Sequence, residues 1–396
     1  MSSPAAAALL ARIAALAPQL AAAGDAAQQL RQLPDDAVAL LGDAGLFWFT
    51  LPAELGGDDV SSLDTVEVLE AIAAIDASVA WNVMLGSEVN AMAAGGMDPA
   101  LAKQLFVEEP RAIMCGGGGP GSTPARAVRQ PDGSVEVWAR TTFMSGSPHS
   151  HYAFIGAPLQ GPGGEPVTSR SGRPIYKTWM LHRDQWTIAD TWDMAGLRGS
   201  GSHDIVVDGG VVPSEHTRVD MWAVPAHYPN PVFRMPIDLR LAFNKAAISL
   251  GVARGALATF AETGRSKRGA AAARVGVAQA RYQSSRAYLL DALARVEAEL
   301  VGNDRLPGPG TTQYARLACT HAGNECMELV AGLHNAAGTS AMRIGHPLER
   351  QLRDAHGAAS HRSISYALYE KLGGILLGDE PTPELAGVTV GPEGRG

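Results

Sequence analysis

Cysteine and charged residues are scarce in this sequence. Its 396 residues include 3 cysteines, and only 18% of positions carry a charged side chain. Three scattered cysteines are too few for a disulfide framework or a CxxC metal or redox site, so we expect a protein of the reducing cytoplasm. The 40 acidic and 32 basic side chains give a net charge of −8 without a concentrated basic face, which argues against nucleic-acid binding.

Long apolar runs are missing as well. No run approaches the roughly 18 residues that a membrane-spanning helix needs. The Ala- and Leu-rich start, residues 1–20, lacks the basic beginning of a signal peptide, and Arg12 interrupts its apolar run. We interpret this segment as an amphipathic helix and expect neither secretion nor membrane binding.

Apolar side chains are nevertheless numerous enough for a large core. They make up 46% of the chain, and the mean hydropathy is close to zero, which excludes disorder for most of the sequence. Three regions follow from the residue pattern. Residues 1–109 show helical spacing, residues 110–225 are rich in Gly, Pro, Thr and Ser, and residues 226–396 are helical again before a loose tail. We expect a domain for each region.

Periodicity predicts individual elements inside these regions. Apolar residues at steps of three and four predict one buried helix over 62–85 and a long helix with an apolar face over 275–300. Alternating runs predict strands over 134–140, 151–157 and 204–212.

Several common active-site motifs are absent or incomplete. The run GGGGPG at 116–121 formally satisfies GxGxxG, but Pro120 and the non-helical sequence that follows favour a plain loop over a dinucleotide site. No P-loop, HExxH or GxSxG motif occurs. His149 and His151 have no evident third ligand, so we expect no metal site.

Four segments together carry a resemblance to a known family: residues 41–57, 143–152, 192–217 and 347–363. The most specific piece is GLRGSGSHDIVVDGGVVP, at 196–213. From about residue 25 to 378 the chain resembles the acyl-CoA dehydrogenase superfamily, and more closely its branch of group D two-component flavin-dependent monooxygenases. The resemblance implies an α+β, mainly α fold with an N-terminal helical domain, a central β-barrel-like domain and a C-terminal four-helix bundle, assembled as a homotetramer.

A catalytic carboxylate distinguishes acyl-CoA dehydrogenases from the monooxygenase branch, and we do not find that carboxylate in this sequence. Acyl-CoA dehydrogenases carry a Glu after an RDA motif, because removal of the α-proton of a thioester requires a base. Here Arg353, Asp354 and Ala355 match the motif, but the window that follows reads SHRS, with His361 near the position of the base. The family's alternative position for this base falls in 238–245, where Asp238 is the nearest acid.

His361 and Ser145 are the predicted catalytic residues. A neutral imidazole can donate one hydrogen bond or accept a proton from a substrate, and the resemblance places His361 beside the oxygen bound to the flavin. His356, one turn earlier, is its main competitor. The resemblance places the Ser145 hydroxyl against flavin N5, with Gly146 allowing close approach of the backbone, although a serine in an ordinary turn explains the same pattern.

The resemblance assigns further positions to ligands. Those assigned to the flavin, besides Ser145 and Gly146, are Arg198, Gly199, Ser200, Ser202, Arg265, Gly338 and Thr339. Those assigned to the substrate are Glu88, Asn90, His149 and Tyr152. For Glu88 and Asn90 a solvated helix face is an equal alternative.

The resemblance thus implies a monooxygenase that uses reduced flavin, FMNH2 with FAD as the second option, and O2. A separate NAD(P)H flavin reductase would supply the flavin. A C4a-hydroperoxyflavin would then oxygenate an aromatic or heteroatom-containing small molecule. Two alternatives stay open: an FAD-dependent acyl-CoA dehydrogenase-type oxidoreductase, and a non-catalytic scaffold of the same fold.

Overall fold

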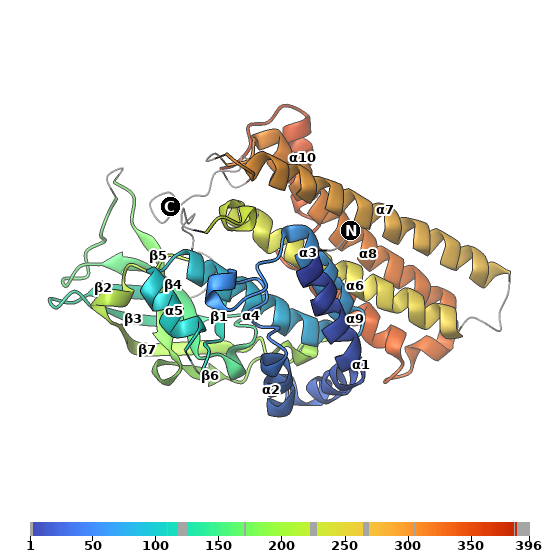
Figure 1. The fold of residues 1–396 in the computed structure, drawn as a ribbon, viewed down its shortest axis with the longest axis horizontal. Coiled ribbons are helices and arrows are strands. Elements are labelled where there is room, and N and C mark those ends of the chain that lie inside the picture. The colour runs from blue at the N-terminus through green and yellow to red at the C-terminus, as the bar shows by residue number, and fades with distance from the viewer. Residues whose placement is uncertain are drawn as a thin grey trace.

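Helices form both ends of the chain and strands form its middle (Figure 1). The computed structural model describes residues 3–108, 110–117, 125–169, 172–221, 228–263, 269–303, 306–383 and 385. The N-terminal helices are α1 (Pro4–Leu30), α2 (Asp35–Asp43), α3 (Ser62–Ala73), α4 (Ala77–Gly95) and α5 (Pro99–Phe106). The expected order of helices, strands and helices is confirmed.

The single helix expected over 62–85 is wrong, because the segment forms two helices. α3 ends at Ala73, and Asp76 begins α4 by accepting a hydrogen bond from the Val79 backbone N–H at 2.9 Å. An aspartate at an N-cap satisfies one of the free N–H groups of the first turn. The apolar spacing continues across this break, which is why periodicity alone did not reveal it.

Helix α1 is an exception to the expectation that no apolar segment is long enough to span a membrane. Among the described residues it is the one helix that is long and apolar enough, by length and composition alone, to cross a membrane. In this structure it packs on α3 and α4 with one face, burying Leu9, Ile13, Leu20 and Ala27.

The central region is one curled sheet. Its strands are β1 (Met114–Gly117), β2 (Arg126–Arg129), β3 (Val135–Thr141), β4 (Tyr152–Gln160), β5 (Tyr176–His182), β6 (Thr187–Ala189) and β7 (Asp204–Val212). They are ordered β1-β4-β2-β3-β7-β6, with β5 paired to β4. The curl brings β5 over β7, since a Cβ added at Gly210 would lie 3.0 Å from the Leu181 side chain. The three strands expected from alternation are confirmed as β3, β4 and β7.

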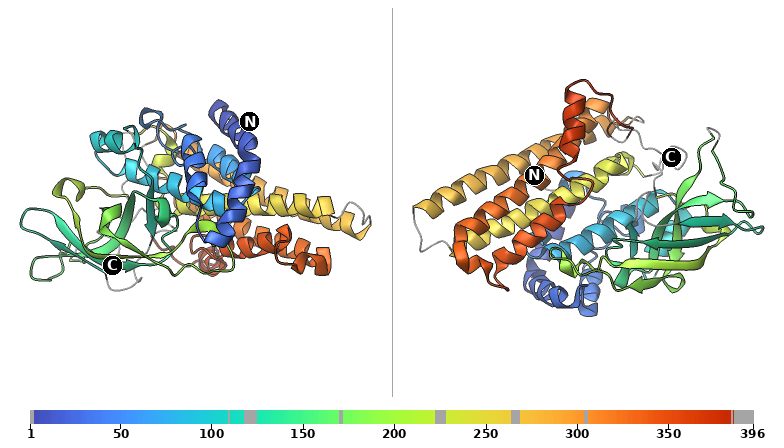
Figure 2. Two further views of the ribbon diagram at one scale, coloured as in Figure 1. Left: turned by 90° about the horizontal axis from the view of Figure 1, so that it is seen from below. Right: turned by 180° about the vertical axis from the view of Figure 1, so that it is seen from behind.

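The C-terminal bundle consists of α6 (Ile237–Thr263), α7 (Ala270–Leu300), α8 (Pro309–Ala337) and α9 (Pro347–Ala359), followed by the short α10 (Leu368–Leu376). Figure 2 shows the bundle from behind, with the sheet at the opposite end of the molecule. α6 packs closely on α3, because a Cβ added at Gly251 would come within 2.4 Å of the Ala73 Cβ. The apolar face expected over 275–300 lies in the core of this bundle.

Candidate active site

Helix α4 runs between the sheet and the bundle, and all of its residues are buried (Figure 1). A helix that is buried on every side contacts several neighbours at once. Trp81, in the second turn of α4, meets the turn after β3 through Ser145 and the turn after α9 through His361. The three regions of the chain therefore converge at this residue.

Three serines form a buried chain of hydroxyls beside Trp81. The Ser145 Oγ lies 2.6 Å from the Ser202 Oγ, which lies 2.6 Å from the Ser200 Oγ. The Trp81 Nε1–H donates to the Ser145 Oγ at 3.2 Å. If Ser202 donates to Ser145, the Ser145 proton is free for a ligand, so this hydroxyl is able to donate outward.

The backbone around these serines is held in two linked turns. Gly146 has a φ of 73°, and its N–H donates to the Ser200 carbonyl at 3.0 Å. Leu197 also has a positive φ, of 50°, and its N–H donates to Asp354 Oδ1 at 2.7 Å. Burial, together with nearby Asp76, raises the pKa of Asp354 to about 7. The RDA aspartate thus supports the loop that carries Ser200 and does not face a ligand.

Gly199 seats this loop against the N-terminal helices. Its N–H donates to the Ser78 Oγ at 3.1 Å, and its carbonyl accepts from the Asn82 Nδ2 at 3.2 Å. A Cβ at Gly199 would lie 2.5 Å from the Ala27 Cβ, so a side chain would push α1 away. The loop therefore has one packed position relative to α4 and α1.

His361 is partly buried and lies edge-on to Trp81, with ring centroids 5.9 Å apart. Its Nδ1 accepts from the Ser363 backbone N–H at 3.2 Å and lies 2.7 Å from the Ser363 Oγ. Because Nδ1 accepts, the ring proton is on Nε2. Burial, and next the charge of Lys245, lowers the pKa of His361 well below 6.5. His361 is therefore a neutral residue with one N–H donor.

Buried polar atoms without partners gather next to Ser145. Within the described residues, Asn82 Oδ1 and His149 Nδ1 are buried and make no hydrogen bond. Both side chains flank Gly146, since a Cβ there would lie 3.6 Å from Asn82 Oδ1 and 3.3 Å from His149 Nε2. Native structures rarely leave such atoms unsatisfied. A flavin ring, whose edge alternates hydrogen-bond donors and acceptors, fits this set of residues.

Glu88 and Asn90, the two predicted substrate residues on α4, both have protein partners. The Glu88 carboxylate is buried, with one oxygen 2.5 Å from the Lys245 Nζ and the other accepting from the Asn244 Nδ2 at 2.7 Å. Asn90 donates to the Phe47 carbonyl and accepts from the Met114 N–H. Neither lies on a solvated face, and Asn90 connects three segments of the backbone.

The other predicted residues lie apart from the serine chain. Arg198 donates to the Gln28 carbonyl and to Asp193, which ties its loop to α1. The Tyr152 ring packs against His182, with centroids 5.2 Å apart. Gly338 and Thr339 are exposed at the end of α8. Arg265 lies outside the described residues. The ligand contacts expected of these positions stay predictions.

Sequence reasoning missed the residues that connect the site. Neither Trp81, which contacts Ser145 and His361, nor Lys245, which holds Glu88, was among the predicted site residues. Ser363, two positions after His361, could have been found, since a hydroxyl at that spacing commonly reaches back to a side chain of the same turn.

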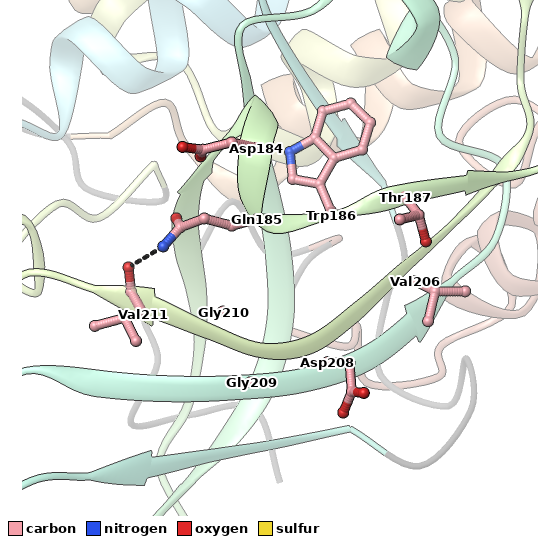
Figure 3. Close-up of a pocket in the computed structure, with 9 residues that line it drawn as sticks. All are labelled: Asp184, Gln185, Trp186, Thr187, Val206, Asp208, Gly209, Gly210 and Val211. Atoms are coloured by element: carbon pink, nitrogen blue, oxygen red, sulfur yellow. Dashed lines mark hydrogen bonds between the residues drawn. The ribbon is translucent and has the colours of Figure 1, made fainter.

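A surface depression lies away from these residues. It has a volume of about 400 Å³ and is formed by the turn before β6 and by β7, near Trp186 and Gly209 (Figure 3). The Gln185 amide donates to the Val211 carbonyl across it, at 2.7 Å. None of its lining residues belongs to the serine chain or the histidine turn, so it is not the candidate active site.

Two family models match the chain. Residues 3–100 match "Acyl-CoA dehydrogenase, N-terminal domain", and residues 244–366 match "Acyl-CoA dehydrogenase, C-terminal domain". The two matches together cover more than half of the chain.

Curated relatives and solved structures cover most of the chain. The indole-3-acetate monooxygenase of Acinetobacter baumannii is 26% identical over 364 residues, which are 88% of each chain. The oxygenase component of the FADH(2)-dependent resorcinol hydroxylase of a Rhizobium species is 25% identical over 401 residues, covering 94% of this chain and 95% of the relative. The crystal structure of the HsaA monooxygenase from M. tuberculosis has a TM-score of 0.84 at 24% identity, covering 96% of this chain and 99% of that chain, and this likeness shows the fold.

Proposed function

The chain belongs to the acyl-CoA dehydrogenase family, and from that premise we propose that it is the oxygenase component of a two-component flavin-dependent monooxygenase. Its substrate is an aromatic small molecule. The relatives named for monooxygenation of indole-3-acetate and hydroxylation of resorcinol support this assignment, since the matches cover 88% and 95% of their length.

The observation that carries the proposal is the contact of Trp81 with both Ser145 and His361. It brings a hydroxyl and a neutral N–H donor to the same place, next to buried polar atoms that lack partners. Both oxygens of the buried Glu88 carboxylate are held by Lys245 and Asn244. Neither oxygen is therefore free to take the α-proton of a thioester, which disfavours the dehydrogenase alternative.

When bound, reduced flavin supplies the two electrons that activate O2, so that one oxygen atom enters the substrate and the other leaves as water. Ser145, Gly146, Ser200 and Ser202 would hold the flavin ring. His361 would donate through Nε2 to a polar atom of a ligand bound beside Trp81, and the packed residues around α4 would exclude water.

The partners and the setting follow from the same proposal. A separate NAD(P)H flavin reductase delivers reduced flavin. FMN is the proposed flavin, and the FADH(2) dependence of the resorcinol hydroxylase makes FAD its competitor. We place the enzyme in the cytoplasm, where its three buried thiols stay reduced, and we propose a homotetramer.

The proposal is tested with labelled oxygen. The protein is mixed anaerobically with reduced FMN or reduced FAD and an aromatic acceptor, indole-3-acetate or resorcinol, and ¹⁸O2 is then admitted. We expect one ¹⁸O atom in each product molecule and less H2O2 than from the same flavin without protein. The proposal is rejected if no aromatic product carries the label and an acyl-CoA instead bleaches the oxidised, protein-bound flavin.

A further inference from the structure

Two buried aspartates lie at the contacts that position the loop at 197–202, which carries two of the three serines of the candidate site. Asp76, at the N-cap of α4, is 3% exposed, and Asp354, near the end of α9, is 2% exposed. The first N–H of the loop donates to Asp354 Oδ1 at 2.7 Å. A later N–H donates at 3.1 Å to the Ser78 Oγ, two residues after Asp76.

One guanidinium serves three carboxylates at this point. Arg350 lies one turn before Asp354 on α9, so the two side chains share a face of the helix. Its Nη1 donates to Asp25 Oδ1 on α1 at 2.8 Å, and its Nη2 lies 3.1 Å from Asp76 Oδ2. Asp25 is exposed to solvent, whereas the other two carboxylates are buried.

The other cations around Asp354 already have anionic partners. Arg353, the next residue back on α9, donates to both oxygens of Glu349. Arg198, on the loop itself, donates to Asp193 at 2.5 Å. A buried carboxylate is unfavourable unless a cation or several donors compensate its charge. The cluster therefore holds one buried anion too many when both buried aspartates are ionised.

The two aspartates differ in how well their charge is supported. Asp76 Oδ1 accepts from the Val79 N–H at the N-terminus of α4, where the helix dipole favours an anion, and Arg350 lies at ion-pair distance. Burial raises the pKa of both aspartates, and the charge of Asp76 raises that of Asp354 further. Carboxylates coupled in this way titrate as a pair, and the proton belongs mainly to Asp354.

The loop is the part of this cluster that yields most easily. Leu197 has a φ of 50°, which is uncommon for a residue other than glycine, so its conformation depends on the contacts that hold it. Asp76 and Asp354 are held by helices instead. A second buried anion is relieved at least cost if the loop moves and water reaches Asp354.

We propose that Asp76 and Asp354 keep one shared proton at neutral pH, and that this proton holds the loop at 197–202 in its flavin-binding position. The inference rests on the proposed function, because it concerns the loop whose serines would hold the flavin ring. Asp354 is then a positioning residue, which acts through the Leu197 N–H. Above neutral pH the proton leaves to solvent, both carboxylates are ionised and the loop opens.

Hydrogen–deuterium exchange of the loop tests the proposal without flavin. The N–H groups at 197 and 199–201 are hydrogen-bonded, so their exchange reports whether the loop opens. Exchange is followed by mass spectrometry at pH 6 and pH 8.5 and corrected for the rates of unstructured peptides. Protection of the wild-type loop should be at least fivefold lower at pH 8.5. In Asp354→Asn, which keeps an acceptor but cannot ionise, the two values should differ by less than twofold.

Three further variants separate the shared proton from a merely structural role. Asp76→Asn keeps an N-cap but removes the opposing charge, so its loop should be equally protected at both pH values. Asp354→Ala removes the acceptor and should lower protection at both. Asp208→Asn, at an exposed position on β7, is the matched control and should keep the wild-type difference.

Equal protection of the wild-type loop at the two pH values overturns the proposal, as does a wild-type difference that survives in Asp354→Asn. If Asp354→Asn does not fold, Asp76→Asn decides in the same way.

The affinity for reduced FMN connects the loop to the flavin. It is measured anaerobically for wild type and Asp354→Asn at the same pH, because reduced flavin itself titrates. The affinities should agree within twofold at pH 6, and the variant should bind at least fivefold more tightly at pH 8.5. Equal affinities at pH 8.5 would overturn the link between the proton and the flavin.

The two proposals fail separately. Loop protection that depends on pH and on both aspartates, without ¹⁸O in any product, would leave the shared proton standing and reject monooxygenation. Labelled product from a protein whose loop protection is the same at pH 6 and pH 8.5 would reject only the shared proton.

Discussion

At the residue scale, the candidate site depends on two contacts of Trp81. Its Nε1–H donates to Ser145, and its ring lies edge-on to His361. The indole therefore fixes the distance between a hydroxyl and an N–H donor that come from different regions of the chain. His361 is oriented a second time by Ser363, whose N–H sets the tautomer. Preorganised donors of this kind stabilise developing charge without having to rearrange during the reaction.

His361→Ala should uncouple the proposed reaction. Without the Nε2–H donor, reduced flavin and O2 should give mainly H2O2, and product per flavin oxidised should fall about tenfold or more. Product and H2O2 are measured side by side. His356 is an exposed histidine on α9, and the control variant His356→Ala should behave like the wild type. A normal product yield in His361→Ala would remove this residue from the site.

His149 should make folding sensitive to mild acid. Burial lowers its pKa in the folded protein to about 4, whereas the unfolded chain has a value of about 6.5. Between these values only the unfolded chain binds the proton, so stability falls as the pH drops from 6.5 to 4, by up to about 3 kcal/mol.

The measurement is the difference in melting temperature between pH 7 and pH 4.5. His149→Phe keeps a ring against Phe47 but cannot titrate, so its melting temperature should drop less than that of the wild type over this interval. Equal drops in the two proteins would show that His149 does not contribute. His356→Gln, which changes an exposed histidine, is the matched control.

The sequence predicted residues whose signal is local. Ser145 was predicted from the SG pair in a turn, and His361 from its register after RDA; their roles stay predictions. The partners of Glu88 were not predictable, because Lys245 lies 157 positions away and nothing in the pattern of α4 indicates which polar residue faces another helix.

At the element scale, the buried ion pair between Glu88 and Lys245 connects α4 to α6. The side chains of Glu88 and Lys245 are each 2% exposed. Glu88→Gln should destabilise the protein by about 3 kcal/mol, because it leaves the Lys245 ammonium buried without an anion. The double change Glu88→Gln with Lys245→Met should recover much of this loss, since an apolar side chain needs no partner. Thermal unfolding at one protein concentration measures both.

The control for this pair is an exposed one. Asp291 and Arg295, one turn apart on α7, are 47% and 59% exposed, and Asp291→Asn should change stability by no more than about 1 kcal/mol. If Glu88→Gln costs no more than this control, the buried pair does not hold α4 to α6.

The helix break at Asp76 belongs to the same scale: propensity and apolar spacing predicted helix on both sides but not the cap between them.

The bundle and the sheet stand at opposite ends of the whole molecule, with α4 between them (Figure 2). The fold was predictable at this scale because the residue patterns of the three regions and the motif at 196–213 both agree with it. The N-terminal α1 shows the limit of composition, since a helix can satisfy the membrane test while it buries Leu9, Ile13 and Leu20 in a protein core. Its docking against Gly199 depends on contacts that composition does not describe.

The proposed homotetramer makes a prediction about the exposed end of the bundle. Met342 is 68% and Ile344 is 99% exposed, next to Gly338 and Thr339, and adjacent apolar side chains of this kind commonly mark an interface. Ile344→Glu should therefore weaken assembly, because removing a carboxylate from water between subunits carries a desolvation cost. Light scattering after gel filtration should show the wild type at about four times 41.3 kDa and the variant at a smaller mass.

Val211→Glu is the matched control for this change, since Val211 is 42% exposed on β7, in the sheet at the other end of the molecule, and should keep the wild-type mass. A wild-type mass of one chain would contradict the tetramer, and an unchanged mass in Ile344→Glu would exclude this end of the bundle from the interface. If Gly338 and Thr339 contact the flavin of a neighbouring subunit, Ile344→Glu should also weaken the binding of reduced flavin, whereas Val211→Glu should not. Retained flavin affinity in a dissociated variant would instead show that each chain holds its flavin alone.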